Sequence, residues 1–290
     1  MDIGAVLIAA GCGIEASMLS GNISVAQRMI AVLQKAGVSM IAVVTDPEDK
    51  KLEKQLAQSG VFFLHNESPV DLARSARLGL DYLQKKCDRI FLVQADRPLL
   101  DPDTLEKMLN ADDSMVVPSH GGRLGQPMLL RAPYQHDVSF GSKIPDSACV
   151  LEVADPGIYL PAAEAAVLED AIANHDRKLT RPVLDFAITR GKPVLDGKLI
   201  TLLQLIRETQ SVRDACSRMQ ISYSTAWNLL NSAEDSLGYP LILRNKGGPS
   251  GSGSLLTERG STLLAACEQF ELAAREKIGK LYDTYFRDII

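Results

Sequence analysis

The sequence predicts an α/β domain with a doubly wound, mostly parallel sheet, followed by a smaller winged helix-turn-helix domain with a long C-terminal helix. The first half alternates short, wholly apolar runs with amphipathic helical stretches, which is typical of a sheet buried on both faces. The second half has two short helical patterns joined by a tight turn, then two strand-like runs around a loop rich in glycine and serine. A chain of 290 residues has room for about two domains.

The alternation in the first half starts with the apolar run 5–10, which Gly11 and Gly13 close. The same reading predicts further strands at 38–45, 61–64 and 89–93, and helices at 24–37, 49–59, 69–85 and 161–174. In an open sheet of this kind, the ligand crevice lies beyond the carboxyl ends of the strands.

Two turns at such strand ends hold candidate ligand-binding residues. Ala10, Gly11 and Gly13 form a loop of small residues after the first strand, which is either a phosphate cradle or a plain turn. Asp96 ends the fourth strand, where Pro98 fixes the turn. Its carboxylate either holds Mg²⁺ against a nucleotide or caps the turn.

The helix-turn-helix pattern begins at Ser211, a helix cap with the carboxylate of Asp214 three residues later. Ser222 is a second N-cap, and the helix it starts ends at Gly238. Polar side chains at the start of this second helix and basic side chains of the wing are the candidates for contacts with DNA. They are Ser222, Tyr223, Ser224, Thr225, Asn228, Arg244 and Lys246.

A last long helix is predicted to start at Thr257. Apolar residues recur along it at spacings of four and three, a pattern suited to pairing with a second copy of the chain. The alternative is packing against its own domain. The residues in this pattern are Leu263, Cys267, Phe270, Ala274, Ile278, Leu281 and Tyr285.

Charge and composition narrow the choice of partners. The net charge is −5, yet residues from Gly197 onward hold 11 Lys and Arg against 10 Asp and Glu. The acidic first half therefore argues against nucleic acid there, and the second half should bind double-stranded DNA through localised contacts of a homodimer. We predict domains at 1–175 and 198–290, with a linker at 176–197 that contains a short structured piece at about 183–188.

Other features exclude several classes of protein. No apolar run is long enough for a membrane helix, and the N-terminus lacks the basic start of a signal peptide. The five cysteines are scattered, without the CxxC spacing of a zinc site. We therefore expect a cytoplasmic protein with free thiols and no membrane partner.

Short motifs of the first half occur together in one known family. They lie at residues 7–11, 95–99, 117–118, 121–127 and 153–157. Together they resemble the MobA/MocA-like nucleotidyltransferases of molybdenum cofactor maturation, over about residues 1–160. The resemblance implies a nucleotidyltransferase-like fold, Mg²⁺-dependent transfer of CMP or GMP to molybdopterin, and a pocket that includes Ala10, Gly11, Gly13, Asp96 and Gly125.

The sequence departs from this family where charge matters most. Glu15 and Ser20 stand where the family has an arginine and a lysine. Replacing an arginine by a glutamate turns attraction for a triphosphate into repulsion, and losing the lysine removes a transition-state clamp. Asp71 occupies the place of a glycine, and Gln126 stands where the family often has histidine.

The second metal carboxylate of the family is also missing, because residues 161–164 read Pro-Ala-Ala-Glu. We therefore expect nucleotidyl transfer to be lost or slowed on the order of 10⁴-fold or more. The crevice is still expected to accept a nucleotide or a molybdopterin-type ligand, with Mg²⁺ only if nucleotide binding is retained. Arg97, Arg123 and Arg131 either replace some of the lost charge or are ordinary surface residues.

Residues 221–227 and the glycine-rich wing ending at 256–260 resemble the winged helix-turn-helix of the ModE family, within the wider LysR-type group. The match covers about residues 197–269 and implies a DNA-binding transcriptional regulator tied to molybdenum. The leading hypothesis is a dimeric regulator with a degenerate transferase-like sensor or partner domain. The alternatives are an active cytidylyl- or guanylyltransferase with a DNA-binding appendage, and a protein whose first half only mediates assembly.

Overall fold

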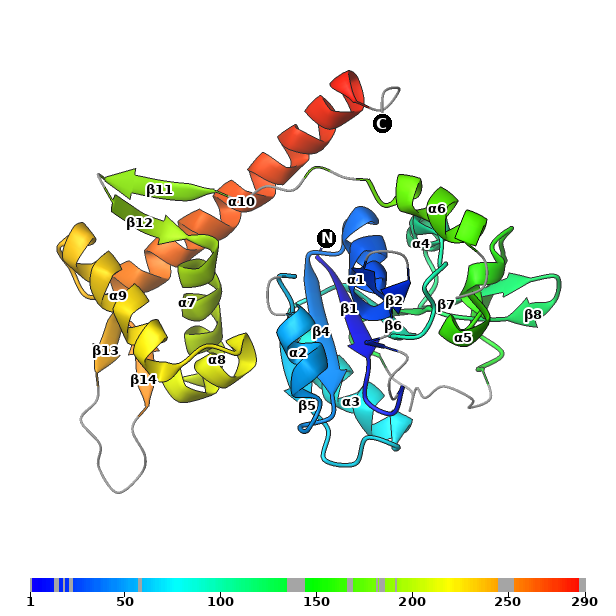
Figure 1. Ribbon diagram of the computed structural model, residues 1–290, viewed down its shortest axis with the longest axis horizontal. Helices are drawn as coiled ribbons and strands as arrows, with labels where there is room; N and C mark the ends of the chain where they lie inside the picture. The colour runs from blue at the N-terminus through cyan, green and yellow to red at the C-terminus, as the bar shows by residue number, and fades with distance from the viewer. Residues whose placement is uncertain are drawn as a thin grey trace. The chain divides into compact units, whose positions relative to one another are not determined.

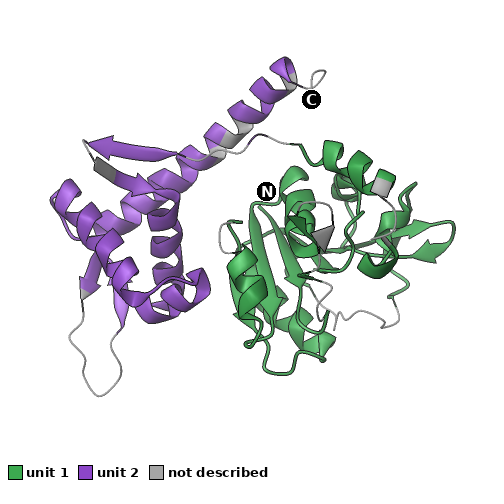
Figure 2. Cartoon of the chain, viewed as in Figure 1, with its two compact units in different colours: residues 1–180 green, residues 181–290 purple. Residues whose placement is uncertain are grey.

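A computed structural model describes residues 2–12, 16–17, 19–20, 23–56, 59–134, 144–165, 169–180, 182, 186–190, 192–244 and 253–286. The chain forms two compact units, Met1–Thr180 and Arg181–Ile290 (Figure 2). Among the described residues, no helix is long and apolar enough to cross a membrane.

Unit 1 is built on one mixed sheet with the strand order β10-β7-β9-β6-β1-β4-β5, and β8 pairs with β7 (Figure 1). Strands β6, β1, β4 and β5 run parallel to one another, whereas β9 lies antiparallel to both of its neighbours, β6 and β7. The strands span β1 Ile3–Ile8, β4 Met40–Thr45, β5 Phe62–His65, β6 Arg89–Gln94, β7 Met115–His120, β8 Arg123–Leu124, β9 Met128–Arg131 and β10 Cys149–Glu152.

Successive side chains of the central strands face opposite sides of the sheet, and both sides are covered by helices, as in a doubly wound fold. On β1, Ala5 and Leu7 face one apolar cluster, and Val6 and Ile8 face another on the opposite side of the sheet. Helices α1, α2 and α4 contribute to the first cluster and α3 to the second. The helices span α1 Val25–Lys35, α2 Lys50–Leu56, α3 Leu72–Leu83 and α4 Pro102–Asn110.

The order of the strands reverses at β1, where a sheet of this kind is expected to bind its ligand. From β1 the chain proceeds to β4 and β5 toward one edge, then returns to β6 on the other side of β1. A ligand crevice in such a sheet lies at this reversal, beyond the carboxyl ends of β1 and β6. Ala10, Gly11 and Asp96 follow these two strands, so the fold places them at the predicted position.

Smaller elements complete unit 1. The short β2–β3 pair leads into α1, which Ser24 and Gln27 start with a reciprocal capping box. Near the end of the unit, α6 follows α5 and ends just before Thr180. These elements span β2 Leu19–Ser20, β3 Ile23–Ser24, η2 Pro156–Ile158, α5 Ala162–Ala165 and α6 Glu169–Lys178.

Unit 2 is a winged helix-turn-helix whose helix starts are the predicted ones. Ser211, Ser222 and Thr257 each accept a backbone N–H from the third residue after them. The wing is the antiparallel pair β13–β14. The elements span α7 Gly197–Thr209, α8 Val212–Met219, α9 Tyr223–Leu237, β13 Ile242–Arg244, β14 Ser254–Leu256 and α10 Glu258–Tyr285.

Residues 176–197, predicted as a linker, contain more structure than expected. They hold the last turn of α6 and an antiparallel hairpin, β11 Ala187–Arg190 with β12 Lys192–Asp196. The hairpin forms because Val194 and Leu195 are buried, and Arg190 donates to the carbonyl of Ser236 on α9. Pro193 is a residue typical of loops, and here it lies within β12 beside these buried side chains.

Candidate ligand crevice and DNA-binding surface

The loop after β1 is tied down by hydrogen bonds within the protein. The backbone amides of Ala9 and Ala10 both donate to the Val44 carbonyl, at 2.9 and 2.8 Å. Gly11 has a φ of +78°, and a Cβ there would lie 2.6 Å from the Pro69 carbonyl oxygen. The amides of Ala9 and Ala10 are therefore committed to β4, and Gly11 is required by its positive φ and by packing. Gly13 lies outside the described residues.

Asp96 forms an ion pair with the next residue. Its Oδ2 lies 2.6 Å from Nη1 of Arg97, and both side chains are about 85% buried, with exposures of 14% and 15%. Burial raises the pKa of the Asp96 carboxyl, and the neighbouring Arg97 opposes that rise. Oδ1 of Asp96 is buried and has no hydrogen-bond partner among the described residues. The candidate metal ligand is thus already neutralised by a cation of the protein.

The other two arginines that were candidates to replace lost charge also have partners inside the protein. The Arg123 guanidinium stacks over the Tyr159 ring, 4.2 Å from its centroid, and Arg131 forms an ion pair with Asp112. Both guanidinium groups therefore already interact with another side chain of the protein, and neither is reserved for a phosphate. Glu15 lies outside the described residues, and only the backbone of Ser20 is described.

The late carboxylate Asp155 has a structural role. It is 6% exposed and accepts three hydrogen bonds: from Thr104 Oγ1 at 2.8 Å, from the Asp101 amide at 3.0 Å and from the Gly157 amide at 2.8 Å. It therefore joins the start of α4 to η2. Among the described residues, no group of three or more His, Cys, Asp or Glu side chains is arranged to hold a metal ion.

The loop that contains Gly125 packs against the η2 segment. The Gly125 amide donates to the Pro118 carbonyl, and a Cβ at this position would lie 2.5 Å from the Ile158 side chain. The next side chain, Gln126, is buried, accepts from the Gln94 amide and donates to the Gln94 side chain. Close packing accounts for the glycine, and Gln126 links this loop to the end of β6.

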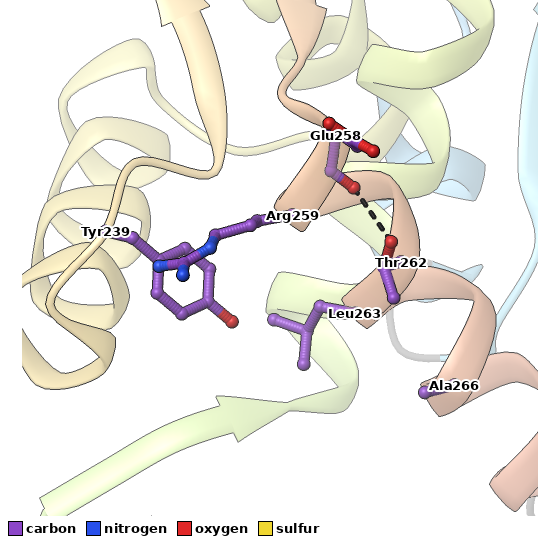
Figure 3. Close-up of a pocket in the computed structure, with 6 residues that line it drawn as sticks. All are labelled: Tyr239, Glu258, Arg259, Thr262, Leu263 and Ala266. Atoms are coloured by element: carbon purple, nitrogen blue, oxygen red, sulfur yellow. Dashed lines mark hydrogen bonds between the residues drawn. The ribbon is translucent and has the colours of Figure 1, made fainter.

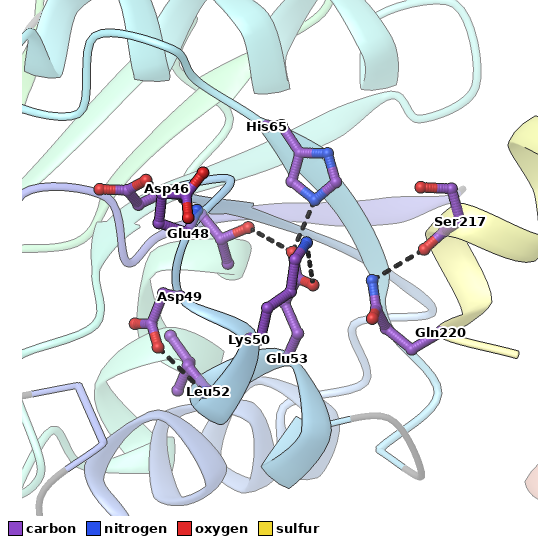
Figure 4. A network of polar contacts seen from close by, with 10 residues as sticks. Asp46, Glu48, Asp49, Lys50, Leu52, Glu53, His65, Ser217 and Gln220 are labelled. Carbon is purple, nitrogen blue, oxygen red and sulfur yellow. Dashed lines mark hydrogen bonds and ion pairs between the residues drawn. The ribbon is translucent and has the colours of Figure 1, made fainter.

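A buried polar cluster at the ends of β4 and β5 was not predicted from the sequence (Figure 4). The fully buried carboxylate of Glu53 accepts from His65 Nε2 at 2.6 Å, from Thr45 Oγ1 at 3.1 Å and from Lys50 Nζ at 3.3 Å. The turn beside it contributes the carboxylates of Asp46, Glu48 and Asp49 (Figure 4). The cluster therefore ties the start of α2 to the ends of β4 and β5.

The start of α9 presents the polar surface that the sequence predicts for DNA. Ser222, Tyr223, Ser224, Thr225 and Asn228 are all exposed. The Ser222 hydroxyl lies 2.9 Å from Ser224 Oγ and 2.7 Å from Thr225 Oγ1. The apolar residues of α9 lie on the other side and are buried, as Ala226 and Leu230 show. Helix α9 therefore has one face in the core and one free to enter a major groove.

The wing and the aromatic pair of α9 complete this surface. The Tyr223 and Trp227 rings meet edge to face, with centroids 5.9 Å apart, and Trp227 is only partly exposed. Arg244 is the last residue of β13, but its side chain and the whole of Lys246 lie outside the described residues. These two candidate contacts remain predictions from the sequence.

At the other end of α9, a groove lies against the start of α10 (Figure 3). The Arg259 guanidinium stacks over the Tyr239 ring, 4.9 Å from its centroid, and Thr262 donates to the Glu258 carbonyl. Leu263 and Ala266 supply its apolar side. The groove is therefore part apolar and part charged, at the junction of α9 and α10.

Comparison with known families defines the class of each half. Residues 16–139 match the family described as the MobA-like NTP transferase domain. Residues 198–261 match the bacterial regulatory helix-turn-helix proteins of the lysR family. Residues 16–139 thus carry a MobA-like NTP transferase match and residues 198–261 a LysR-family helix-turn-helix match, which confirms these two resemblances predicted from the sequence.

Individual relatives agree with the second assignment. The chain is 30% identical over 91 residues to the molybdenum-pterin-binding protein MopA of Rhodobacter capsulatus, covering 31% of this chain and 34% of that protein. It is 32% identical over 77 residues to the transcriptional regulator ModE of Haemophilus influenzae, covering 27% and 30%. The chain spans about a third of the length of these curated relatives.

Among solved structures, the chain is similar to a nucleotidyl transferase from Methanothermobacter thermautotroptrophicus, with 18% identity and a TM-score of 0.48. That match covers 60% of this chain and 98% of the other. A cytidylyltransferase from Leptospira borgpetersenii matches with 13% identity and a TM-score of 0.45, over 63% of this chain and 99% of the other.

Proposed function

We propose that this protein is a DNA-binding transcriptional regulator linked to molybdenum or molybdopterin metabolism, in which the transferase-like unit is a sensor or partner-binding module. The observation that carries the proposal is the exposed polar start of α9 inside a LysR-family match. Relatives named as ModE regulators and a Mop pterin-binding protein support the link to molybdenum.

DNA recognition would use α9 and the wing. The side chains of Ser222, Ser224, Thr225 and Asn228 would meet base edges and phosphates in the major groove, because they are exposed at the N-terminal end of the recognition helix. Arg244 and Lys246 would contact phosphates on either side. The nearly neutral charge of this unit makes binding depend on these few contacts.

The proposed functional form is a homodimer paired through α10. This 28-residue helix carries apolar side chains that remain solvent-exposed: Phe270 at 55%, Leu281 at 54% and Tyr285 at 64%. Full burial of an exposed side chain of this size is favourable by about 1.5–3 kcal/mol, so covering these half-exposed ones would contribute about half of that each. Two recognition helices would then read two half-sites of one operator.

The transferase-like unit is proposed to bind a ligand without transferring a nucleotide. Mg²⁺ prefers several oxygen ligands, but Asp96 is paired with Arg97 and Asp155 is occupied by three internal donors. The described residues therefore do not fit a Mg²⁺ site, and no catalytic step is assigned to one. A nucleotide or a molybdopterin-type compound is the expected class of ligand.

The competing candidate is an active cytidylyl- or guanylyltransferase, which the MobA-like match over residues 16–139 favours. Incubation with CTP or GTP, Mg²⁺ and molybdopterin separates the two. We expect no pyrophosphate above the level of a blank. Release at ordinary enzyme rates would establish the transferase and reject the degenerate module.

The experiment that tests DNA binding is selection of bound duplexes from a random pool, repeated with nucleotides and molybdopterin present. We expect a two-fold-symmetric site to be enriched and the enrichment to change with one ligand. Recovery of unselected sequences at every round would contradict a sequence-specific regulator. Enrichment that no ligand changes would retain the DNA-binding role and remove the sensor role.

A further inference from the structure

The last helix of unit 1 is held by a buried polar cluster that the proposed function does not use. Arg28 of α1 is fully buried, and its Nη1 lies 2.6 Å from Asp176 Oδ1 and 3.2 Å from His175 Nδ1. The other ring nitrogen, His175 Nε2, lies 2.7 Å from the Leu100 carbonyl oxygen. Both partners of His175 on α6 thus come from elements far away in the sequence.

These two contacts admit a single protonation state of the ring. A guanidinium only donates, so His175 Nδ1 must accept and carry no proton. A carbonyl oxygen only accepts, so Nε2 must carry the proton. A doubly protonated ring would place an N–H and a positive charge against Arg28, in a site where His175 is 6% exposed.

The remaining charged groups around His175 are Asp101 and Asp155 at the start of α4, and Asp176 and Lys178 on α6 itself. Burial lowers the pKa of His175, with Arg28 acting in the same direction, while the Leu100 carbonyl, Asp101 and Asp155 oppose it. The pKa therefore remains below the ordinary value of 6.5.

Helix α6 connects the candidate crevice to the chain that enters unit 2. Leu100 and Asp101 directly follow the Asp96 turn, and Lys178 on α6 forms an ion pair with Asp101, the N-cap of α4. Lys35 of α1 donates to the Thr180 carbonyl, at the last residue of unit 1. Detaching α6 would lengthen the chain between the units and separate it from the Asp96 turn.

We propose that the contact between Arg28 and His175 is a proton-operated latch, which holds α6 on α1 and α4 while His175 is neutral and releases it when His175 is protonated. The released helix binds protons more readily than the docked one, because His175 regains its ordinary pKa in water. Docking is therefore fully favourable above pH 6.5 and is lost as the pH falls below that value. The latch goes beyond the proposed DNA-binding role and does not require it.

Amide hydrogen exchange of the full chain tests the latch, with exchange times scaled for the intrinsic rate at each pH. Between about pH 7.5 and about pH 5.5, protection of residues 169–180 should fall by up to about tenfold for each pH unit below 6.5, with β1 and β6 unchanged. His175→Gln, which stays neutral and can both donate and accept, should abolish this dependence. His120→Gln on the β7 strand should leave it as in the wild type.

In the exchange experiment, the latch would be overturned by equal protection of α6 at both ends of the pH range, or by an unchanged pH response in His175→Gln. If that variant does not fold, the imidazole resonances of wild-type His175 give the answer directly. The latch requires their titration midpoint to lie below 6.5 and to coincide with loss of protection in α6. A midpoint at or above 6.5 would reject it.

Discussion

Arg97 lies against Asp96 at the end of β6, with Nη1 2.6 Å from Oδ2, so the carboxylate at the head of the crevice is neutralised by its own neighbour. In a transferase this carboxylate would have to bind a metal ion, and the guanidinium would have to move away first. The pair is mostly buried, which makes separation of the two charges unfavourable. This ion pair supports a structural role for Asp96, which substitution of either residue can test.

Asp96→Asn should lower the free energy of unfolding of unit 1 by about 2 kcal/mol, because Arg97 would stay buried without its counter-ion. Urea denaturation, followed in the full chain by a probe in unit 1, measures the change. The double variant Asp96→Asn with Arg97→Gln should be less destabilised than the sum of its two single variants. Unchanged stability together with weaker nucleotide binding would instead identify Asp96 as a ligand-binding group.

Asp155→Ala should destabilise unit 1 by about 3 kcal/mol, since three buried or partly buried donors would lose their acceptor. The same urea measurement applies. Asp103→Ala is a matched control, because it removes an exposed carboxylate from the same helix start and should cost no more than about 0.5 kcal/mol. If Asp155→Ala were as stable as the control, the carboxylate would be available for another role.

The sequence was sufficient to predict elements whose signals are local. Wholly apolar runs such as 5–10 placed the central strands, and the hydroxyls of Ser211, Ser222 and Thr257 placed three helix starts. The hairpin at 187–196 was missed because its stability comes from burial against other helices, while its glycine and proline resemble loop signals.

The site was only partly predictable, for a related reason. Position at a strand end identified Ala10, Gly11 and Asp96, but it did not reveal that the Ala10 amide and the Asp96 carboxylate are already occupied. Contacts such as Arg28 with His175 join residues 147 positions apart. No local pattern encodes such a contact, because it depends on how two helices pack.

Ser222 has two roles that different substitutions can separate. Ser222→Ala removes the cap of α9 and should lower stability of unit 2 by about 1 kcal/mol. Ser222→Asp keeps a capping oxygen, so stability should stay near that of the wild type, yet the added negative charge should weaken DNA binding through repulsion of phosphates. Thermal unfolding and a fluorescence binding titration measure the two effects. Wild-type DNA affinity in Ser222→Asp would exclude this end of α9 from the interface.

We expect side chains of α9 to read bases and side chains of the wing to contact phosphates, so substitutions in the two elements should affect DNA binding differently. Asn228→Ala should change the preferred base at one position of the site, by about 1–3 kcal/mol of discrimination. Lys246→Ala should weaken binding to all sequences alike and reduce the slope of log affinity against log salt by about 1. Titrations at several salt concentrations measure both, with the exposed Ser232→Ala on α9 as control. Wild-type behaviour of both variants would mean that the docking described for α9 and the wing is wrong.

Leu281→Asp tests whether α10 pairs two chains. The side chain is 54% exposed in the single chain, so a carboxylate there should leave the folded unit intact. In a dimer paired through this face, the same carboxylate would replace buried apolar surface, and the dissociation constant should rise by about 10- to 100-fold. Sedimentation equilibrium measures this dissociation constant.

Ala265→Asp adds the same charge at another exposed position of α10, roughly half a turn away around the helix, and should leave the dimer unchanged. A wild-type protein that stays monomeric at every concentration, or equal effects of both substitutions, would rule out pairing through this face.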